Sequence, residues 1–335
     1  RLSAANTLAR TVRVDAGTLA LNNVNALTYA TLDTGSSGAQ SVSFALPGAN
    51  TYNLGGLAGS DALNLGANNL SIGEQGGNFS FTGDLIGTGS VFKRGGGTFT
   101  MSGASAFTGG VTVQQAGTLV IPSVANIGTA QPLGAGSSPV ALNLGTLVIT
   151  GAGPHSTNRG LALGNNTNTL QVDGTVSMSG EITGGGSSAT FTKSGAGTFN
   201  QSGAGSWNSD LNVTAGTYNV TSTGSISGVG VVGLSGGSTM NIDTSTQVRA
   251  SSFNLSAGTL NLNAGTLRTN GITVAGGSAF GWGAGTLTVQ NANSGNSGNT
   301  DRTGDNGSGG AASGPTIYEG TQLTIDNGIG NTVAT

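Results

Sequence analysis

A four-residue motif, Ala-Gly-Thr-Leu, returns along this chain, and an alternating apolar and polar stretch follows each copy. Looser copies vary the flanking residues, and the marker glycines stand at positions 97, 117, 145, 174, 197, 216, 237, 258 and 285. A recurrence of about 20 residues, stretched by occasional insertions, is typical of a solenoid whose rungs are short strands and turns. The unaltered copies begin at Ala16, Ala116, Ala257, Ala264 and Ala284.

Strict alternation after each motif indicates strands, because successive side chains of a strand point to opposite faces. Stretches such as Gly258-Thr259-Leu260-Asn261-Leu262 predict apolar side chains inside and Thr or Asn outside. Glycines between the strands supply the positive φ angles of tight corners. The residues predicted to face the core are Phe99, Met101, Val113, Leu119, Ile121, Leu147, Ile149, Phe199, Val213, Met240, Ile242, Leu255, Leu260, Leu262, Leu287 and Val289, and those predicted to face outward are Thr98, Thr100, Asn241, Asn261 and Thr288.

An all-β, right-handed parallel β-helix with rungs of about 20 residues fits this pattern, because every rung must fill the same cross-section. About 16 such rungs, ~4.8 Å apart, would form a rod about 75 Å long. Stacked rungs place like residues above like residues, so Asn, Ser and Thr can form ladders along the outside. Stacked like charges would repel one another, which accounts for a charged fraction of only 7%.

Composition excludes several classes of partner and site. The net charge is −3 and the ten Lys and Arg residues are scattered, which argues against nucleic acid as a partner. The chain has no cysteine and one histidine, which leaves little scope for a zinc site. No run of 18 apolar residues occurs, so we expect no membrane-spanning helix. We also expect no cofactor.

Two segments interrupt the rung pattern. We expect residues 1–289 to form β-helix rungs, with a lateral loop near 122–139 where alternating pairs are few. Residues 290–314 are predicted to be a flexible low-complexity loop. Residues 315–335 should contain a further rung strand.

A long internal copy is the most specific feature of the sequence. Residues 93–113 align without gaps to residues 193–213, and the shared pattern is K-x-G-x-G-T-F-x-x-S-G-A, an aromatic residue (Phe107 or Trp207) and then an apolar strand. This pattern resembles the autotransporter-associated β-strand repeat. Residues 81–90 resemble the strand that precedes the repeat, and residues 133–136 and 156–159 resemble its spacers. Gln201 departs from the pattern by replacing an apolar residue, which suggests a less well packed second copy.

The resemblance implies a right-handed β-helix displayed outside a bacterial cell, and it implies no activity. We therefore expect an extracellular structural or adhesive rod of the cell surface. The two alternatives are a β-helix enzyme that degrades polysaccharides and a non-catalytic module that binds glycans. Because a rung pattern runs to both ends, we expect either identical chains stacked end to end into a fibre or a segment of a longer array. Identical chains are thus the expected partners, and surface glycans are the alternative partner.

Candidate chemistry is sparse. The thirteen carboxylates are spread out, and His155 follows Gly-Pro in a spacer where we expect a solvated loop. We therefore predict no enzyme and no catalytic, cofactor-binding or metal-binding residue, and expect Asp84→Ala, Glu181→Ala and His155→Ala to have no effect on activity. Residues 301–307 only faintly resemble a calcium loop, because an acidic twelfth residue and flanking helices are missing.

Two lysines and three aromatic residues have simple structural interpretations. Lys93 and Lys193 each follow an acid in the sequence, Asp84 and Glu181, and could form surface ion pairs with them. Trp207, Phe280 and Trp282 could stack on sugars, but filling the core is the favoured interpretation.

Overall fold

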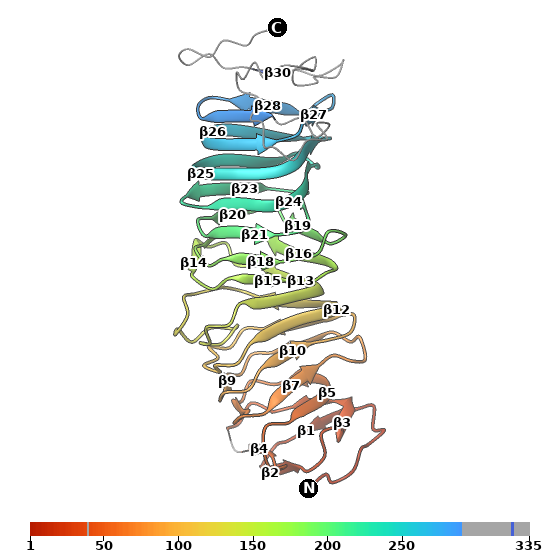
Figure 1. The fold of residues 1–335 in the computed structure, drawn as a ribbon. Coiled ribbons are helices and arrows are strands. Elements are labelled where there is room, and N and C mark those ends of the chain that lie inside the picture. The colour runs from red at the N-terminus through yellow and green to blue at the C-terminus, as the bar shows by residue number, and fades with distance from the viewer. Residues whose placement is uncertain (39, 290–322, 325–335) are drawn as a thin grey trace.

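The computed structural model describes residues 1–38, 40–289 and 323–324, which form a rod of stacked parallel strands without a helix (Figure 1). The rod has about 13 turns with a spacing of about 21 residues, which confirms the predicted solenoid. The prediction of about 16 rungs refers to all 335 residues, and the 13 turns are those of the described part. The turns differ in length, since Thr112 pairs with Ala141, which lies well beyond the length of a regular rung.

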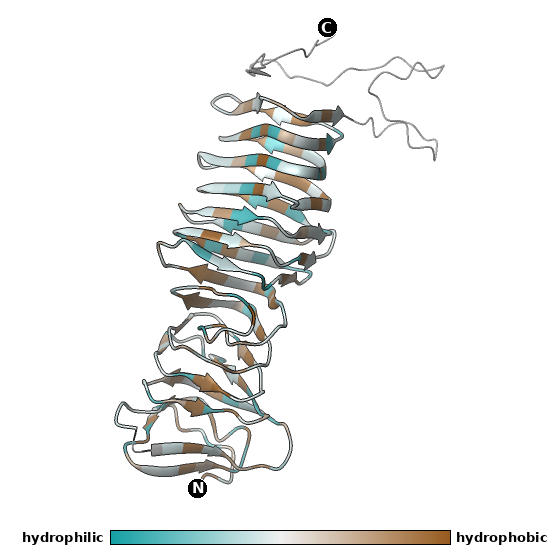
Figure 2. Cartoon of the chain, turned by 90° about the vertical axis from the view of Figure 1, so that its left-hand side faces the viewer, coloured by the Kyte–Doolittle hydropathy of each residue, from teal (hydrophilic) through white to brown (hydrophobic). Residues whose placement is uncertain are grey.

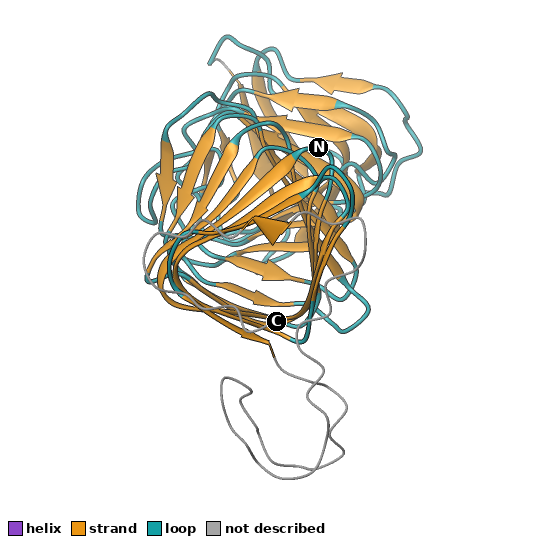
Figure 3. Cartoon of the chain, turned by 90° about the horizontal axis from the view of Figure 1, so that it is seen from above, coloured by secondary structure: helices purple, strands orange, loops and turns teal. Residues whose placement is uncertain are grey.

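The rod has three sides, visible in the view along its axis (Figure 3). The first side contains β7 (Asn69–Ile72), β10 (Val91–Lys93), β15 (Leu161–Leu163), β18 (Ile182–Gly184), β21 (Ala204–Trp207) and β29 (Thr286–Val289). The second side contains β1 (Thr11–Arg13), β8 (Phe79–Phe81), β11 (Thr98–Met101), β16 (Thr167–Val172), β19 (Thr190–Ser194), β22 (Asp210–Val213) and β27 (Ile272–Val274).

The third side is irregular near the N-terminus and regular from β14 onward. Two small sheets, β2 with β4 and β6 with β9, occupy its beginning. The strands of the third side are β2 (Gly17–Leu21), β4 (Gln40–Phe44), β6 (Leu63–Asn64), β9 (Leu85–Ile86), β14 (His155–Thr157), β17 (Thr175–Met178), β20 (Thr198–Gln201), β23 (Thr217–Ser222), β28 (Ala279–Trp282) and β30 (Leu323–Thr324).

Longer strands bend around corners and serve more than one side. For example, residues 239–244, 247–250 and 253–255 of one strand pair on the third, first and second sides in turn. These strands are β3 (Leu27–Asp33), β5 (Thr51–Ala58), β12 (Val111–Ile121), β13 (Val140–Ile149), β24 (Ser225–Leu234), β25 (Ser238–Leu255) and β26 (Gly258–Thr269).

The core follows the alternation read from the sequence. The predicted core residues from Phe99 to Leu262 are buried, and Thr98, Thr100, Asn241 and Asn261 lie at half-buried outward positions. Stacked columns such as Val176, Phe199 and Tyr218 run along the inside.

The last predicted strand residues, Leu287 to Val289, behave differently. Leu287 packs against the core but is only partly buried; among the described strands, β26 is the partner of its strand β29. Thr288 pairs with Arg268 at an outward position of the ladder, as predicted, but it is buried, 6% exposed. We find no physical reason for this burial among its described neighbours. The side chain of Val289 lies outside the described residues.

Glycine supplies only part of the corner geometry. Gly97 has φ 80° and Gly265 has φ 74°, as the motif predicts. At Gly117 the prediction is wrong, because the preceding Gln115 and Ala116 have the positive φ angles, 57° and 58°. There β12 continues round the corner with a bulge, so the corner lies just upstream of the motif glycine.

The interruption at residues 122–139 connects β12 to β13 without a strand. The predicted low-complexity loop at residues 290–314 lies outside the described residues, as does the segment 315–335 apart from β30. In the described part of the chain there is no helix of the length and apolar character that crossing a bilayer requires.

Candidate functional site

The two lysines of the internal copy lie inside the rod. Lys93 ends β10 and is 0% exposed. Its Nζ donates hydrogen bonds to the carbonyl oxygens of Arg94 (2.6 Å), Gly95 (2.8 Å) and Gly96 (3.3 Å). An ammonium group has three N–H donors, so these carbonyl groups of the corner satisfy all of them.

Lys193 repeats the arrangement and also joins two rungs. Its Nζ donates to Gly195 O (2.8 Å), Gly197 O (2.6 Å) and Ala215 O (2.8 Å). Ala215 belongs to the following rung, just before Gly216 with φ 64°. A Cβ at Gly216 would come within 2.6 Å of the Lys193 Nζ, so the glycine of the motif makes room for the ammonium group. The K-x-G-x-G-T sequence is thus a corner closed from within by its own lysine.

The predicted surface ion pairs of Lys93 and Lys193 are therefore wrong. Both lysines occupy inward ladder positions, where they pair with Val113 and Val213. The sequence did contain the signal, because Lys93 lies two residues after the buried Val91 and alternation puts both on the same face. A charged residue in an otherwise apolar column was read as a surface residue, although its corner supplies the acceptors that a buried charge requires.

Burial and hydrogen bonding act on these ammonium groups in opposite directions. Removal from water lowers the pKa of both lysines to about 8, and for Lys193 the nearby Asp173 carboxylate partly opposes this effect. The carbonyl acceptors favour the charged form, because they bind donors. The net effect is a lowered pKa, so each amine loses its proton at a lower pH than an exposed lysine does.

The two copies of the motif lie on different sides of the rod. Lys93 is on the first side, and its column continues through Val113, Leu142 and Leu163 to Gly184, four turns on. Lys193 is on the next side, in β19. The repeat sequence therefore forms a corner between two strands, and this corner can lie between different sides of the three-sided rod.

Gln201 is a second correction, because the second copy is not poorly packed. Gln201 is 0% exposed and faces the core at the end of β20. Its Nε2 donates to Gly203 O and Ser225 O, both at 3.1 Å, and its Oε1 accepts the hydroxyl of Tyr218. Burial raises the pKa of Tyr218, so this hydroxyl stays protonated and keeps donating. The ring of Tyr218 packs edge-on against Phe199, with 5.2 Å between centroids.

A ladder of asparagines runs along the outside of the third side. The Nδ2 atoms of Asn219, Asn241 and Asn261 each donate to the Oδ1 of the asparagine one rung below, at 2.7, 2.8 and 2.8 Å. Asn200 begins this series and donates to Ser177 Oγ at 3.1 Å. The predicted polar ladders are thereby confirmed on this side. Figure 2 faces the third side and shows polar colour at the same place on successive upper strands.

A threonine column lies two residues before the asparagine ladder. Its members are in register from β17 to β26, so that hydroxyl groups repeat about every 4.8 Å along the rod. They are half-buried and uncharged. These two columns give the third side a regular polar strip without charge, although Asp243 of β25 lies further along the same side and is exposed. The column consists of Thr175, Thr198, Thr217, Thr239 and Thr259.

Three basic or polar side chains fasten the lateral loop to the rod. Arg159 is 2% exposed, and its guanidinium donates to the carbonyl oxygens of Leu133 (2.6 Å), Gly134 (2.9 Å) and Gly136. Thr157 Oγ1 donates to Ala125 O, and Asn158 Oδ1 accepts from Ile127 N, each at 2.8 Å. The two spacers recognised in the sequence, residues 133–136 and 156–159, are thus bound to each other.

The other candidate residues have structural positions. Trp207 and Phe280 are both 2% exposed and belong to the core, which confirms the core interpretation for these two. Trp282 is half-buried against the core, and its Nε1 donates to Gly285 O at 3.2 Å. The loop prediction for His155 is wrong, because it begins β14 in register with the core residue Val176, and its buried Nε2 has no hydrogen-bond partner.

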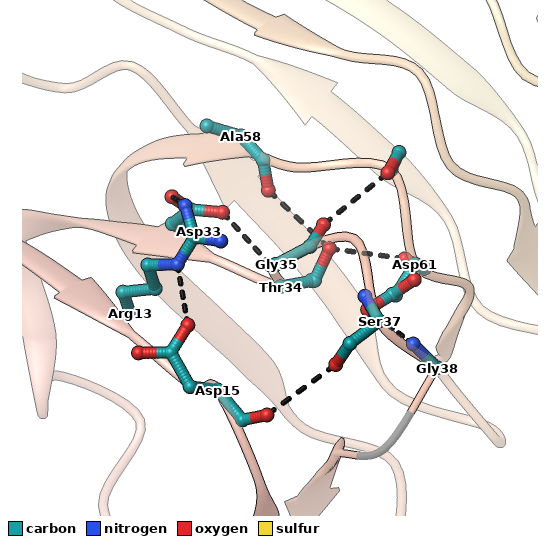
Figure 4. Close-up of polar contacts among 10 residues, drawn as sticks. Arg13, Asp15, Asp33, Thr34, Gly35, Ser37, Gly38, Ala58 and Asp61 are labelled. Carbon is teal, nitrogen blue, oxygen red and sulfur yellow. Dashed lines mark hydrogen bonds and ion pairs between the residues drawn. The ribbon is translucent and has the colours of Figure 1, made fainter.

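Three acidic residues, Asp15, Asp33 and Asp61, lie in one group of polar contacts near the N-terminus (Figure 4). Arg13 binds Asp15 (2.6 Å) and Asp33 (3.4 Å), and these carboxylates, the hydrogen-bonded Asp15 first, raise the pKa of Arg13. Asp33 Oδ1 also accepts Gly35 N at 2.8 Å, and Asp61 Oδ2 accepts Ser37 N at 3.0 Å. These carboxylates hold surface turns. Among the described residues, no group of three or more His, Cys, Asp or Glu side chains could hold a metal ion. Residues 301–307 lie outside the described part.

Two comparisons with known proteins both identify similarity to autotransporter passengers. The model of the passenger-associated-transport repeat matches residues 91–121, which contain the Lys93 corner from β10 to β12. The chain is also 31% identical over 252 residues to the adhesin BmaC autotransporter of Brucella suis biovar 1 (strain 1330). The chain is an autotransporter-associated β-helix repeat protein.

This relationship covers unequal shares of the two proteins. The alignment includes 71% of the present chain but only 6% of the Brucella adhesin. No solved structure matches the chain. In this chain, the matched repeat contains the lysine-closed corner and the two strands that it joins.

Proposed function

We propose that this chain is a non-catalytic stretch of an extracellular passenger rod, which has a structural and adhesive role at a bacterial cell surface. The observation that carries the proposal is how the charged groups are used. Both lysines and Arg159 are buried on backbone carbonyl groups, and uncharged Thr and Asn columns run along the outer third side. The passenger-repeat match and the similarity to a long adhesin support the same role and an extracellular location.

A rod built in this way projects whatever it carries. About 13 turns at ~4.8 Å per turn give a length of about 60 Å. Internal corners and external amide ladders join successive rungs without disulfides, since the chain contains no cysteine. The regular outer face is suited to contact another extended surface over many rungs.

Adhesion can be tested with the purified chain on beads. Beads coated with this protein should bind bacterial or host cell surfaces better than beads coated with an unrelated protein of equal net charge. Equal binding by the two kinds of bead would remove the adhesive part of the proposal. Release of reducing sugar from a panel of polysaccharides would remove the non-catalytic part.

End-to-end stacking of identical chains is a finer and separate proposal. A rung at the end of a β-helix leaves backbone N–H and C=O groups unpaired, and another rung can pair with them. Analytical ultracentrifugation over a concentration series would reveal stacks as a growing sedimentation coefficient. A chain that stays monomeric at high concentration, with ordered and solvent-exposed end rungs, would refute the stacking.

A further inference from the structure

The polar strip of the third side keeps one register over successive rungs. Its threonine column and its asparagine ladder lie two residues apart on each strand from β20 to β26, and Ser177 takes the asparagine position in β17. Neighbouring rungs are about 4.8 Å apart, so the two columns run about 7 Å apart over a length of about 20 Å. The strip ends at β28, where Ala279 and Gly281 occupy the same two positions.

Much of the hydrogen-bonding capacity of the strip is unused. In the described part of the chain, the hydroxyl groups of the threonine column make no hydrogen bond, and none of them is sealed from solvent. Each inner amide of the ladder, such as that of Asn219, gives one N–H and one lone pair to its neighbours. An amide has two N–H donors and two lone pairs, so one of each remains for a partner. Donors and acceptors therefore repeat on every rung.

The side chains of the strip are also held in place. Hydrogen bonds along the ladder fix the amide groups, and the β-branched threonines have restricted χ1 angles. A partner that binds such a surface pays little for ordering its side chains. A rigid array with a constant repeat is best matched by a partner that is itself extended and has the same repeat.

Charge decides which kind of extended partner fits. The strip itself contains no charged residue, but exposed carboxylates flank it. Asp173 stands two residues before Thr175, and Asp243 stands two residues after Asn241. An anionic chain lying on the strip would be repelled by both carboxylates, whereas an uncharged chain would not.

We propose that the polar strip binds an extended, neutral, β-linked polysaccharide of the cellulose type, which lies along the rod. Each sugar unit of such a chain advances by about the distance between two rungs and presents hydroxyl groups at both of its edges. These hydroxyl groups can pair with a threonine hydroxyl and an asparagine amide on rung after rung. The proposal rests on the adhesive role proposed above and names the class of ligand for it.

Calorimetric titration of the 335-residue chain tests the proposal with three hexasaccharides. Cellohexaose is neutral and extended, maltohexaose is neutral but coiled, and a cellouronate hexamer has the cellulose backbone with a carboxylate on each unit. We expect cellohexaose to bind and the other two to bind at least about tenfold more weakly. Equal binding of maltohexaose would refute the match of repeats, and equal binding of the cellouronate would refute the charge argument.

Paired threonine variants separate the strip from the rest of the surface. The double variant Thr217→Val with Thr239→Val removes two neighbouring hydroxyl groups and keeps the shape of the side chains, so cellohexaose should bind about tenfold more weakly. The matched control is Thr146→Val with Thr169→Val, two half-buried threonines in register on the second side. Val148 and Gln171 take the place of the ladder there, so affinity should stay within about twofold.

The outcomes also separate the ligand from the adhesive role. Adhesion of the coated beads without binding of cellohexaose would overturn the ligand assignment and leave the adhesive rod, whereas absence of both would remove both. Unchanged affinity in the strip variant, or an equal loss in the control, would also overturn the assignment. If cellohexaose does not bind and the strip variant instead abolishes self-association in sedimentation, the occupant of the strip is a second copy of this chain and the proposal is wrong.

Discussion

Replacing Lys193 by methionine tests how the buried corner balances desolvation against hydrogen bonding. The substitution keeps the length of the side chain but removes its charge. In the folded chain burial lowers the pKa of Lys193 to about 8, whereas the unfolded chain has the ordinary value of 10.5. The unfolded chain therefore holds more protons between these pH values, so the free energy of unfolding rises with pH across this window.

The expected size of the effect follows from the shift. Each unit of pKa difference corresponds to about 1.4 kcal/mol, so Lys193 contributes a rise of about 3 kcal/mol between pH 8 and 10.5. Lys93 contributes a similar rise, because burial also lowers its pKa to about 8. The rise should therefore halve in Lys193→Met and disappear in the double variant with Lys93→Met.

Urea unfolding across this pH window, followed by the fluorescence of the buried Trp207, measures these differences. Arg94→Gln serves as a control, because it removes a partly exposed cation beside the Lys93 corner and should run parallel to the unmodified chain. If the profile of Lys193→Met is parallel to that of the unmodified chain, the carbonyl acceptors fully compensate burial and the lowered pKa is wrong.

Two further substitutions test the ladder and the lateral loop. Gly281 stands in register above Asn261, whose Oδ1 would lie 2.7 Å from a Cβ placed there, so Gly281→Asn should extend the asparagine ladder after a small side-chain adjustment. We expect a gain of about 1–2 kcal/mol in thermal unfolding, from one hydrogen bond and the loss of a strand glycine, and no gain from Gly271→Asn outside the ladder. Arg159→Met should lower the free energy of unfolding by about 3 kcal/mol or more, because it leaves three buried carbonyl oxygens without their hydrogen-bond donor. It should also make residues 122–139 sensitive to limited proteolysis. Resistance equal to that of the unmodified chain would contradict the fastening role of Arg159.

The general architecture could be predicted because the rungs repeat one local rule. Alternation of apolar and polar residues decided which side chains face the core, and it held from Phe99 to Leu262. The same rule predicted the outer ladders, since stacked rungs place Asn219 beside Asn241 in register. These features depend on periods that are visible in the sequence itself.

The misplaced residues share one physical cause. Lys93 and Lys193 were assigned to the surface because they are charged, and Gln201 was expected to weaken the packing of its rung because it is polar. Inside a solenoid, however, corners expose backbone carbonyl groups toward the interior, and long polar side chains can satisfy them there. Only the path of the backbone shows these acceptors. His155 was misplaced differently, because β14 begins closer to the proline than the spacer pattern indicated.

The register of the polar strip depends on rung length in the same way. Each insertion changes which residues meet on neighbouring rungs. The rungs of this rod differ in length, from the short one that pairs Thr51 with Asn69 to the long one that pairs Thr112 with Ala141. A regular sequence period predicts that a ladder exists, whereas the partners within it follow only from the actual corners.

The most direct test of the account is the reactivity of the lysine amines. Lys93 and Lys193 are the only lysines of the chain, and the structure places both inside the rod with 0% exposure. Brief treatment of the native protein with an amine-acetylating reagent near neutral pH, followed by peptide mass spectrometry, measures their accessibility. The account predicts that both lysines remain unmodified while the chain is folded and react fully after denaturation in urea. Rapid acetylation of either lysine in the folded protein, at the rate of an exposed lysine, would contradict the lysine-closed corners.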